Sequence, residues 1–176
     1  VTIRNGQGSD SIAIGHDAGA NTQQQQAIAI GYQAGFDTQG LQSIAIGYQA
    51  GQTTQSGYSV AVGQQAGQVN QSQNAVALGT GAAGLYQGMS AVAVGSGTAL
   101  YNQGDNAVAV GGGAAGNHQG AGAVAIGLNA GYSYQGNSAI AIGYNAGFDH
   151  QPANSIIINA SGSQFDGLNA GLYINP

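Results

Sequence analysis

Residues 43–51 read SIAIGYQAG, and close variants of this stretch recur along most of the chain. The first residue of each copy falls at 11, 27, 43, 59, 75, 91, 107, 123, 139 and 155, so the spacing is sixteen residues every time. We number the places of each copy 1 to 16 from that residue. A short, fixed period is the signature of a solenoid, in which each repeat packs on its neighbours. The 176 residues are therefore predicted to form one repeat array.

Places 2 to 5 of nearly every copy hold an aliphatic residue, alanine, an aliphatic residue and glycine, as in Ile44-Ala45-Ile46-Gly47. The alternation predicts a short strand. The glycine predicts a sharp change of chain direction, because glycine tolerates positive φ. A copy of this length can hold two strands of about five residues and two turns. The sequence therefore predicts an all-β fold of stacked two-strand coils.

The alternation also separates small from large side chains, because neighbouring residues of a strand point to opposite faces. A thin roll has room inside for alanine but little room for a second large layer, so we expect the larger residues to point outward. An apolar stripe along a soluble rod needs a partner. The opposite arrangement, with isoleucine and valine inside, is the alternative. The residues expected in this aliphatic stripe are Ile12, Ile14, Ile28, Ile30, Ile44, Ile46, Val60, Val62, Val76, Leu78, Val92, Val94, Val108, Val110, Val124, Ile126, Ile140, Ile142, Ile156 and Ile158.

The repeats resemble the head repeat of trimeric autotransporter adhesins, the YadA-like head, over residues 11–158. The resemblance implies a left-handed parallel β-roll that assembles as a homotrimer, with the aliphatic stripe packed at the shared trimer axis. It also implies a structural and adhesive segment of an extracellular fibre that mediates attachment to a host or another surface. The partners it implies are further copies of the chain and a host-surface glycan or protein.

Two features are more similar to the same roll in viral and phage fibres. The coil is longer than in the bacterial heads, and its place 13 is glutamine in all nine full copies. Residues 171–176 read GLYINP and are similar to the short segment that precedes a self-cleaving C-terminal chaperone domain in such fibres. A virion surface and a bacterial cell surface are therefore both retained as expected locations.

The pattern divides the chain into three segments. Residues 1–10 are expected to be the end of a preceding coil, because Gln7 and Gly8 match places 13 and 14 of the later copies. Residues 11–158 are the repeat array. The pattern dissolves after this, so residues 159–176 are expected to be a transition segment towards a further C-terminal domain.

Composition narrows the classes of partner. Charged residues make up 4% of the chain and the net charge is −5. Arg4 is the single cation, and one cation cannot neutralise several phosphates, which argues against nucleic-acid binding. The sequence has no apolar run or basic amphipathic stretch suited to membrane insertion. Cysteine is absent, which removes disulfides and thiolate chemistry.

Glutamine at place 13 is the sharpest polar feature of the sequence. Identical amides stacked at one place can form a hydrogen-bonded ladder along the rod. We expect this ladder to be structural, and a binding role is the alternative. The residues concerned are Gln23, Gln39, Gln55, Gln71, Gln87, Gln103, Gln119, Gln135 and Gln151.

Aromatic residues gather in two parts of the array. Tyr32 and Tyr48 share place 6 of adjacent copies, with Phe36 at place 10, and four more rings lie near the far end. Exposed rings beside asparagine and glutamine can stack on sugars and hydrogen-bond their hydroxyls. The alternative is that the rings only stiffen the sheet or pack between subunits. The candidate glycan contacts are Tyr32, Phe36, Tyr48, Tyr132, Tyr134, Tyr144 and Phe148.

The sequence predicts no catalytic, metal or cofactor site. No pair among His16, His118 and His150 has metal-ligand spacing within one strand, and we expect all three at the surface or in turns. The six aspartates are scattered and the serines have no neighbouring base. The chain is thus predicted not to be an enzyme, although a glycan-degrading spike with an acid–base pair between subunits is retained as an alternative.

Two further alternatives are an ice-binding solenoid and a fibre spacer that binds nothing. Flat sheets with threonine columns bind ice, and Thr22, Thr38 and Thr54 align at place 12. The column ends at Asn70, which leaves only a small threonine plane. The adhesive fibre segment is therefore the favoured interpretation.

Overall fold

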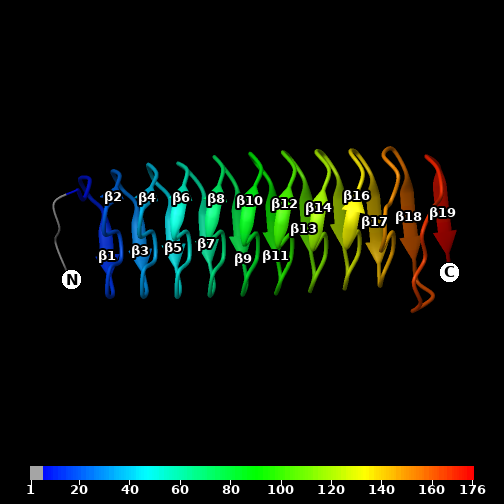
Figure 1. Ribbon diagram of the computed structural model, residues 1–176, viewed down its shortest axis with the longest axis horizontal. Helices are drawn as coiled ribbons and strands as arrows, with labels where there is room; N and C mark the ends of the chain where they lie inside the picture. The colour runs from blue at the N-terminus through cyan, green and yellow to red at the C-terminus, as the bar shows by residue number, and fades with distance from the viewer. Residues whose placement is uncertain (1–5) are drawn as a thin grey trace.

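A computed structural model describes residues 6–176, which form an all-β parallel solenoid with the shape of a straight rod (Figure 1). The strands lie across the long axis of the rod, and successive coils follow one another from one end to the other. Residues 1–5 of the expected preceding coil lie outside the described part. Gln7, in the remainder of that coil, forms a parallel bridge with Gln23.

Two parallel sheets run along the rod. The first has eleven strands, which mostly begin at place 2 of each coil. In spatial order they are β1 (Ile12–Ile14), β3 (Ile28–Ile30), β5 (Ile44–Ile46), β7 (Val60–Val62), β9 (Val76–Leu78), β11 (Val92–Val94), β13 (Val108–Val110), β15 (Val124–Ile126), β17 (Ile140–Gly143), β18 (Ile156–Asn159) and β19 (Leu172–Asn175).

The second sheet has eight strands, each of which ends at the glutamine of place 13. In spatial order they are β16 (Ser133–Gln135), β14 (Asn117–Gln119), β12 (Tyr101–Gln103), β10 (Leu85–Gln87), β8 (Val69–Gln71), β6 (Thr53–Gln55), β4 (Thr38–Gln39) and β2 (Thr22–Gln23). The two sheets alternate along the chain from β1 to β17, so each of these coils contributes one strand to each sheet, whereas β17, β18 and β19 follow one another in the first sheet.

The pairing register follows the sequence period. Ile44 in β5 pairs with Ile28 in β3 on one side and with Val60 in β7 on the other. Identical places of the repeat therefore lie side by side throughout both sheets. This register confirms the predicted parallel solenoid with coils of sixteen residues.

The strands are shorter than the predicted five residues, because much of each coil is spent on tight turns. Most strands have only two or three residues. The glycines of place 5 have φ between 111° and 134°, and places 7, 9 and 16 adopt the left-handed conformation in coil after coil. Each of these residues redirects the chain, so little of a coil stays extended.

Alanine makes up most of the apolar core. The alanines of place 3 are at most 5% exposed, whereas the isoleucine and valine residues on either side of them stay partly exposed. The space between the sheets is filled by small alanine side chains and by glutamine side chains. The predicted orientation is confirmed, and the alternative with isoleucine and valine inside is wrong because that space holds no second layer of large side chains.

The last coils depart from the repeat without ending the sheet. Ile157 replaces the alanine of place 3 and is fully buried, and Phe165 and Tyr173 pack against the end of the core. β19 then pairs in register with β18, again at an offset of sixteen residues. The segment expected to be a transition from residue 159 onward therefore contributes a further strand of the same sheet.

Replacing Gly63 by alanine should destabilise the rod by about 3 kcal/mol, because the residue has φ +131° and a Cβ would lie 2.6 Å from the carbonyl oxygen of Gly79. The matched control is Gly112→Ala, at place 6, where the added Cβ meets its nearest atom, Leu128 Cδ1, at an ordinary 3.4 Å. The midpoint of urea unfolding measures both variants. Equal midpoints for the two variants would contradict the claim that place 5 requires glycine.

Candidate functional site

The aliphatic stripe defined above lies on the outer face of the eleven-stranded sheet. Ile12 and Ile14 in its first strand are 44% and 46% exposed, and stripe residues within the array are mostly half-buried because neighbouring coils cover their flanks. Leu172 and Ile174 in β19 extend the stripe. Sequence reasoning missed these two residues because the irregular chain before them hides the period. Their offset of sixteen residues from β18 was the available signal.

The stripe contains no polar residue at places 2 and 4 in any of the eleven strands. Single exposed apolar residues are normal on soluble proteins, but a continuous apolar face of this length marks an interaction surface. The apolar face results from the alternation along each strand. Because alanine points into the core, the larger side chains on either side of it must point outward. The stripe is the leading candidate for a surface at which the rod assembles.

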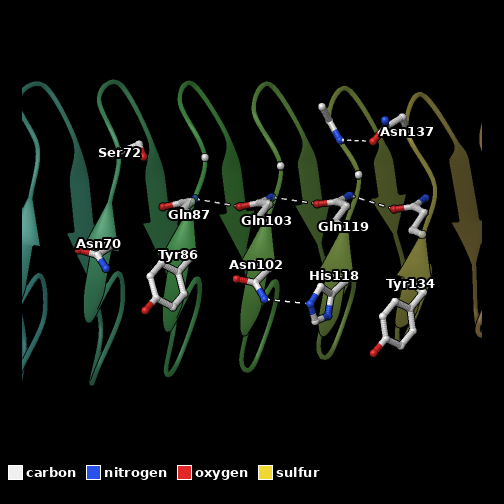
Figure 2. Close-up of a pocket in the computed structure, with 15 residues that line it drawn as sticks. Asn70, Ser72, Tyr86, Gln87, Asn102, Gln103, His118, Gln119, Tyr134 and Asn137 are labelled. Atoms are coloured by element: carbon white, nitrogen blue, oxygen red, sulfur yellow. Dashed lines mark hydrogen bonds between the residues drawn. The ribbon is translucent and has the colours of Figure 1, made fainter.

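The glutamines of place 13 are buried and join the two sheets. Their exposure is at most 3%, and each Nε2 donates to the carbonyl oxygen of place 2 in the same coil over 2.7–2.9 Å. Nε2 of Gln87 also donates to Oε1 of Gln103 at 3.1 Å, and similar bonds link most neighbouring coils (Figure 2). These amides form a ladder inside the core, and their side chains are almost entirely covered.

The ladder has one break. Gln55 Oε1 is buried and accepts no hydrogen bond, whereas Nε2 of Gln39 donates to backbone carbonyls instead. The backbone changes at the same step, because Thr54 takes a φ of 53° and Thr38 keeps a conformation outside the left-handed region. The three threonines of place 12 thus do not form one uniform column, which weighs against a flat ice-binding face.

The aromatic residues form columns along the rod. At place 6, Tyr32 stacks between His16 and Tyr48, with ring centroids 5.4 and 5.3 Å apart. At place 10, Tyr132 stacks on Phe148 at 5.1 Å. Each column joins rings from adjacent coils, because the repeat brings equal places together.

The rings near the far end do not make one cluster. Tyr134 belongs to place 12 and stacks between His118 and His150, with both centroid distances at 4.9 Å. Tyr144 belongs to place 6 and is 43% exposed, and Phe36 belongs to place 10 at the other end of the rod. The seven candidate glycan contacts therefore lie in three different columns and do not form one binding site.

All three histidines are exposed, as predicted, although their stacking on tyrosine was not foreseen. His16 Nδ1 lies 3.1 Å from an Asp17 carboxylate oxygen, and His150 Nδ1 lies 2.7 Å from one of Asp149. Residues 6–176 contain no group of three His, Cys, Asp or Glu side chains arranged to hold a metal ion. The same residues include no helix with the length and apolar character needed to cross a membrane.

A groove follows the outer face of the eight-stranded sheet (Figure 2). Side chains of place 12 form one wall over five successive coils, residues of places 13 and 14 form the floor, and Ala121 and Asn137 of place 15 form the opposite side. Its volume is about 620 Å³. Sequence reasoning missed Tyr86 in this wall because it stands apart from the other rings in the sequence, although it shares place 12 with Tyr134. The residues of the wall are Asn70, Tyr86, Asn102, His118 and Tyr134.

Comparison with known families identifies part of the array. Residues 7–34 match two copies of the YadA head domain repeat, a structural repeat of adhesin heads and not an enzyme domain. Comparisons with curated proteins and with solved structures gave no significant match. The matched residues 7–34 fold as the first turns of the parallel β-solenoid.

The ladder predicts a large effect for Gln87→Leu. The change removes the Nε2 group that donates to Val76 O and to Gln103 Oε1, so the buried Gln103 Oε1 would lose its ladder donor. It also removes the Oε1 acceptor of Gln71 Nε2, which would keep only its backbone acceptors. We expect a loss of about 3 kcal/mol in the free energy of unfolding. Gln64→Leu is the control, because Gln64 is exposed at place 6, where Leu128 occurs naturally. A Gln87 variant as stable as the control would show that the ladder contributes little.

Proposed function

We propose that this chain is a segment of the head of a trimeric surface adhesin, with the aliphatic stripe of three chains packed at a common axis. The stripe carries the proposal, because it runs unbroken over eleven strands and points away from a core that has no room for it. The head then both builds the fibre and presents the other faces of the rods for attachment to a host or another surface.

Association would remove most of the exposed apolar area. Full burial of one isoleucine or valine side chain contributes roughly 1.5–3 kcal/mol, and the middle of the stripe is half-buried already. Each layer of a trimer would bring together six such side chains, two from each chain. The gain repeats at every coil, so even a fraction of this value per layer accumulates to a stable assembly over the length of the rod.

The number of chains and the handedness of the roll come from the matched repeat rather than from the geometry of one chain. The match to YadA head repeats at residues 7–34 supports three chains and a left-handed roll. It also supports a position on the cell surface, where such heads are exposed. The segment that resembles the approach to a viral chaperone domain forms the regular strand β19, so the geometry gives the virion alternative no added support.

The surface chemistry suits attachment in the extracellular medium. Residues 6–176 contain neither lysine nor arginine, and the faces away from the stripe are rich in asparagine, glutamine, serine and tyrosine. Six aspartates without a lysine or arginine make the surface of these residues weakly negative, which disfavours anionic partners, and the exposed rings and amides suit uncharged ones. A host glycan or an uncharged protein face is the partner class that fits.

The proposal predicts that the wild-type chain sediments with three times the protomer mass of 17.2 kDa at micromolar concentration. Val94→Asp should reduce this mass to that of one protomer, because three carboxylates would meet at the axis with no counter-charge. Tyr86→Asp is the control: this side chain is 54% exposed on the other sheet, and aspartate tolerates its φ of 58°.

Sedimentation equilibrium measures all three proteins, and circular dichroism checks that each is folded. A wild-type mass of one protomer, or an unchanged trimer in Val94→Asp, would contradict the axial position of the stripe. Loss of the trimer in Tyr86→Asp would instead indicate an interface on the eight-stranded sheet, which would also contradict the proposal.

A further inference from the structure

The groove on the eight-stranded sheet is built by a repeated feature of the backbone. Its wall residues all adopt the left-handed conformation, with φ between 52° and 58°. The glutamine that follows each of them points into the core. This bulge-like turn sends the side chain of place 12 outward in five successive coils, so the wall is continuous.

The floor of the groove is open because glycine occupies place 14 in its central coils. A Cβ on Gly104 would lie 2.6 Å from the backbone nitrogen of Ala121 in the next coil, so close packing of the coils requires glycine there. The same glycines leave the floor without side chains. Asn137 closes the far edge, where its Oδ1 accepts a hydrogen bond from Ala121 N at 3.0 Å (Figure 2).

The polar groups of the wall are held in place before any ligand arrives. Asn102 Nδ2 lies 3.0 Å from His118 Nε2, and His118 Nδ1 lies 2.7 Å from Asn117 Oδ1. The ring of Tyr134 stacks between His118 and His150, so its edge and hydroxyl, rather than its faces, are the parts it offers to a ligand. Such fixed side chains lose little conformational entropy when a ligand binds.

The residues that line the groove carry no lysine or arginine, and the Asp105 carboxylate lies beside Gly88 at the edge of the floor, where it accepts a hydrogen bond from Met89 N. The groove therefore offers nothing to a phosphate, a sulfate or an acidic sugar. It also offers little to a peptide strand, because the backbone N–H groups of its floor are already used. Gly88, Gly104 and Gly120 each donate theirs to the coil that follows, at 2.8 Å. Phenol rings, amides and an imidazole at an uncharged surface are instead the groups that bind neutral sugars.

The period of the wall matches a polymer. Adjacent coils lie about 4.8 Å apart, close to the length of one pyranose unit in an extended chain. Tyr86 and Tyr134 are three coils apart, which separates the two rings by roughly 14 Å. Figure 2 shows both phenol hydroxyls pointing away from the glutamine ladder, with Asn102 and His118 between the rings.

We propose that this groove binds a neutral, linear oligosaccharide that lies along the long axis of the rod, with about one sugar per coil. This inference rests on the proposed function, attachment to a surface, and adds the class of ligand to which the head would attach. The groove itself lies within one chain. It also lies on the sheet that does not carry the aliphatic stripe, so assembly through the stripe leaves it open.

Isothermal titration of the wild-type chain with cellohexaose, chitohexaose and maltohexaose tests the proposal, with hexagalacturonate as the acidic counter-probe. At least one neutral hexasaccharide should bind more tightly than the counter-probe. With that sugar, affinity should rise with chain length up to about five units and then level off, because the wall spans five coils. No heat with any neutral sugar at millimolar concentration, or tighter binding of hexagalacturonate, would overturn it.

Tyr86→Asn removes one ring while keeping the fold, because asparagine occupies the same place with the same φ in the two adjacent coils, at Asn70 and Asn102. It should weaken binding by roughly tenfold or more. The matched control is Tyr48→Gln, which removes an exposed ring from place 6, where Gln64 follows naturally. An equal loss in the control, or no loss in Tyr86→Asn, would overturn the assignment.

Sedimentation of the same samples separates this inference from the proposed function. A trimer that binds no neutral sugar refutes the groove and leaves the assembly. A single chain that binds sugar with the predicted Tyr86 dependence supports the groove and refutes the trimer.

Discussion

The thickness of the core is the constraint on which the rest of this structure depends. The side chain at place 3 is alanine in nine successive coils, so the eleven-stranded sheet can approach the second sheet closely. The residues beside each alanine must then point outward, whatever their polarity. Because these residues are isoleucine, valine and leucine, a single rod has an apolar face that only association can cover. The fold and the proposed assembly thus follow from one alternation.

The same thin core explains the buried glutamines. An extended amide side chain can reach from one sheet to the backbone carbonyls of the other, and in doing so it fills space that alanine leaves. The outer faces of the two sheets can consequently differ in composition. The stripe side is uniform and apolar, whereas place 12 varies from asparagine to tyrosine and histidine and forms the groove. The proposed assembly and the proposed recognition therefore lie on opposite sheets.

The period of the sequence predicted the register, the alanine core and the outward stripe, because all three follow from side-chain direction in a strand. It did not predict the left-handed conformation at place 12, where the residue types include tyrosine and threonine, which rarely adopt it. The groove depends on that conformation. Tyr134 and Tyr144 are separated because they stand at places 12 and 6, so their proximity in the sequence suggested a cluster that the fold divides. The break at Gln55 was equally hidden, because the glutamine column is unbroken in the sequence.

Small-angle X-ray scattering tests the central claim most directly, because forward scattering gives mass and the distance distribution gives the longest dimension. Side-by-side packing through the stripe predicts three times the protomer mass of 17.2 kDa with the length of one rod, about 50 Å for roughly ten coils. The mass of one chain would show that an exposed stripe is stable in water. Three times the mass with three times the length would show end-to-end stacking instead, and either result would contradict the account.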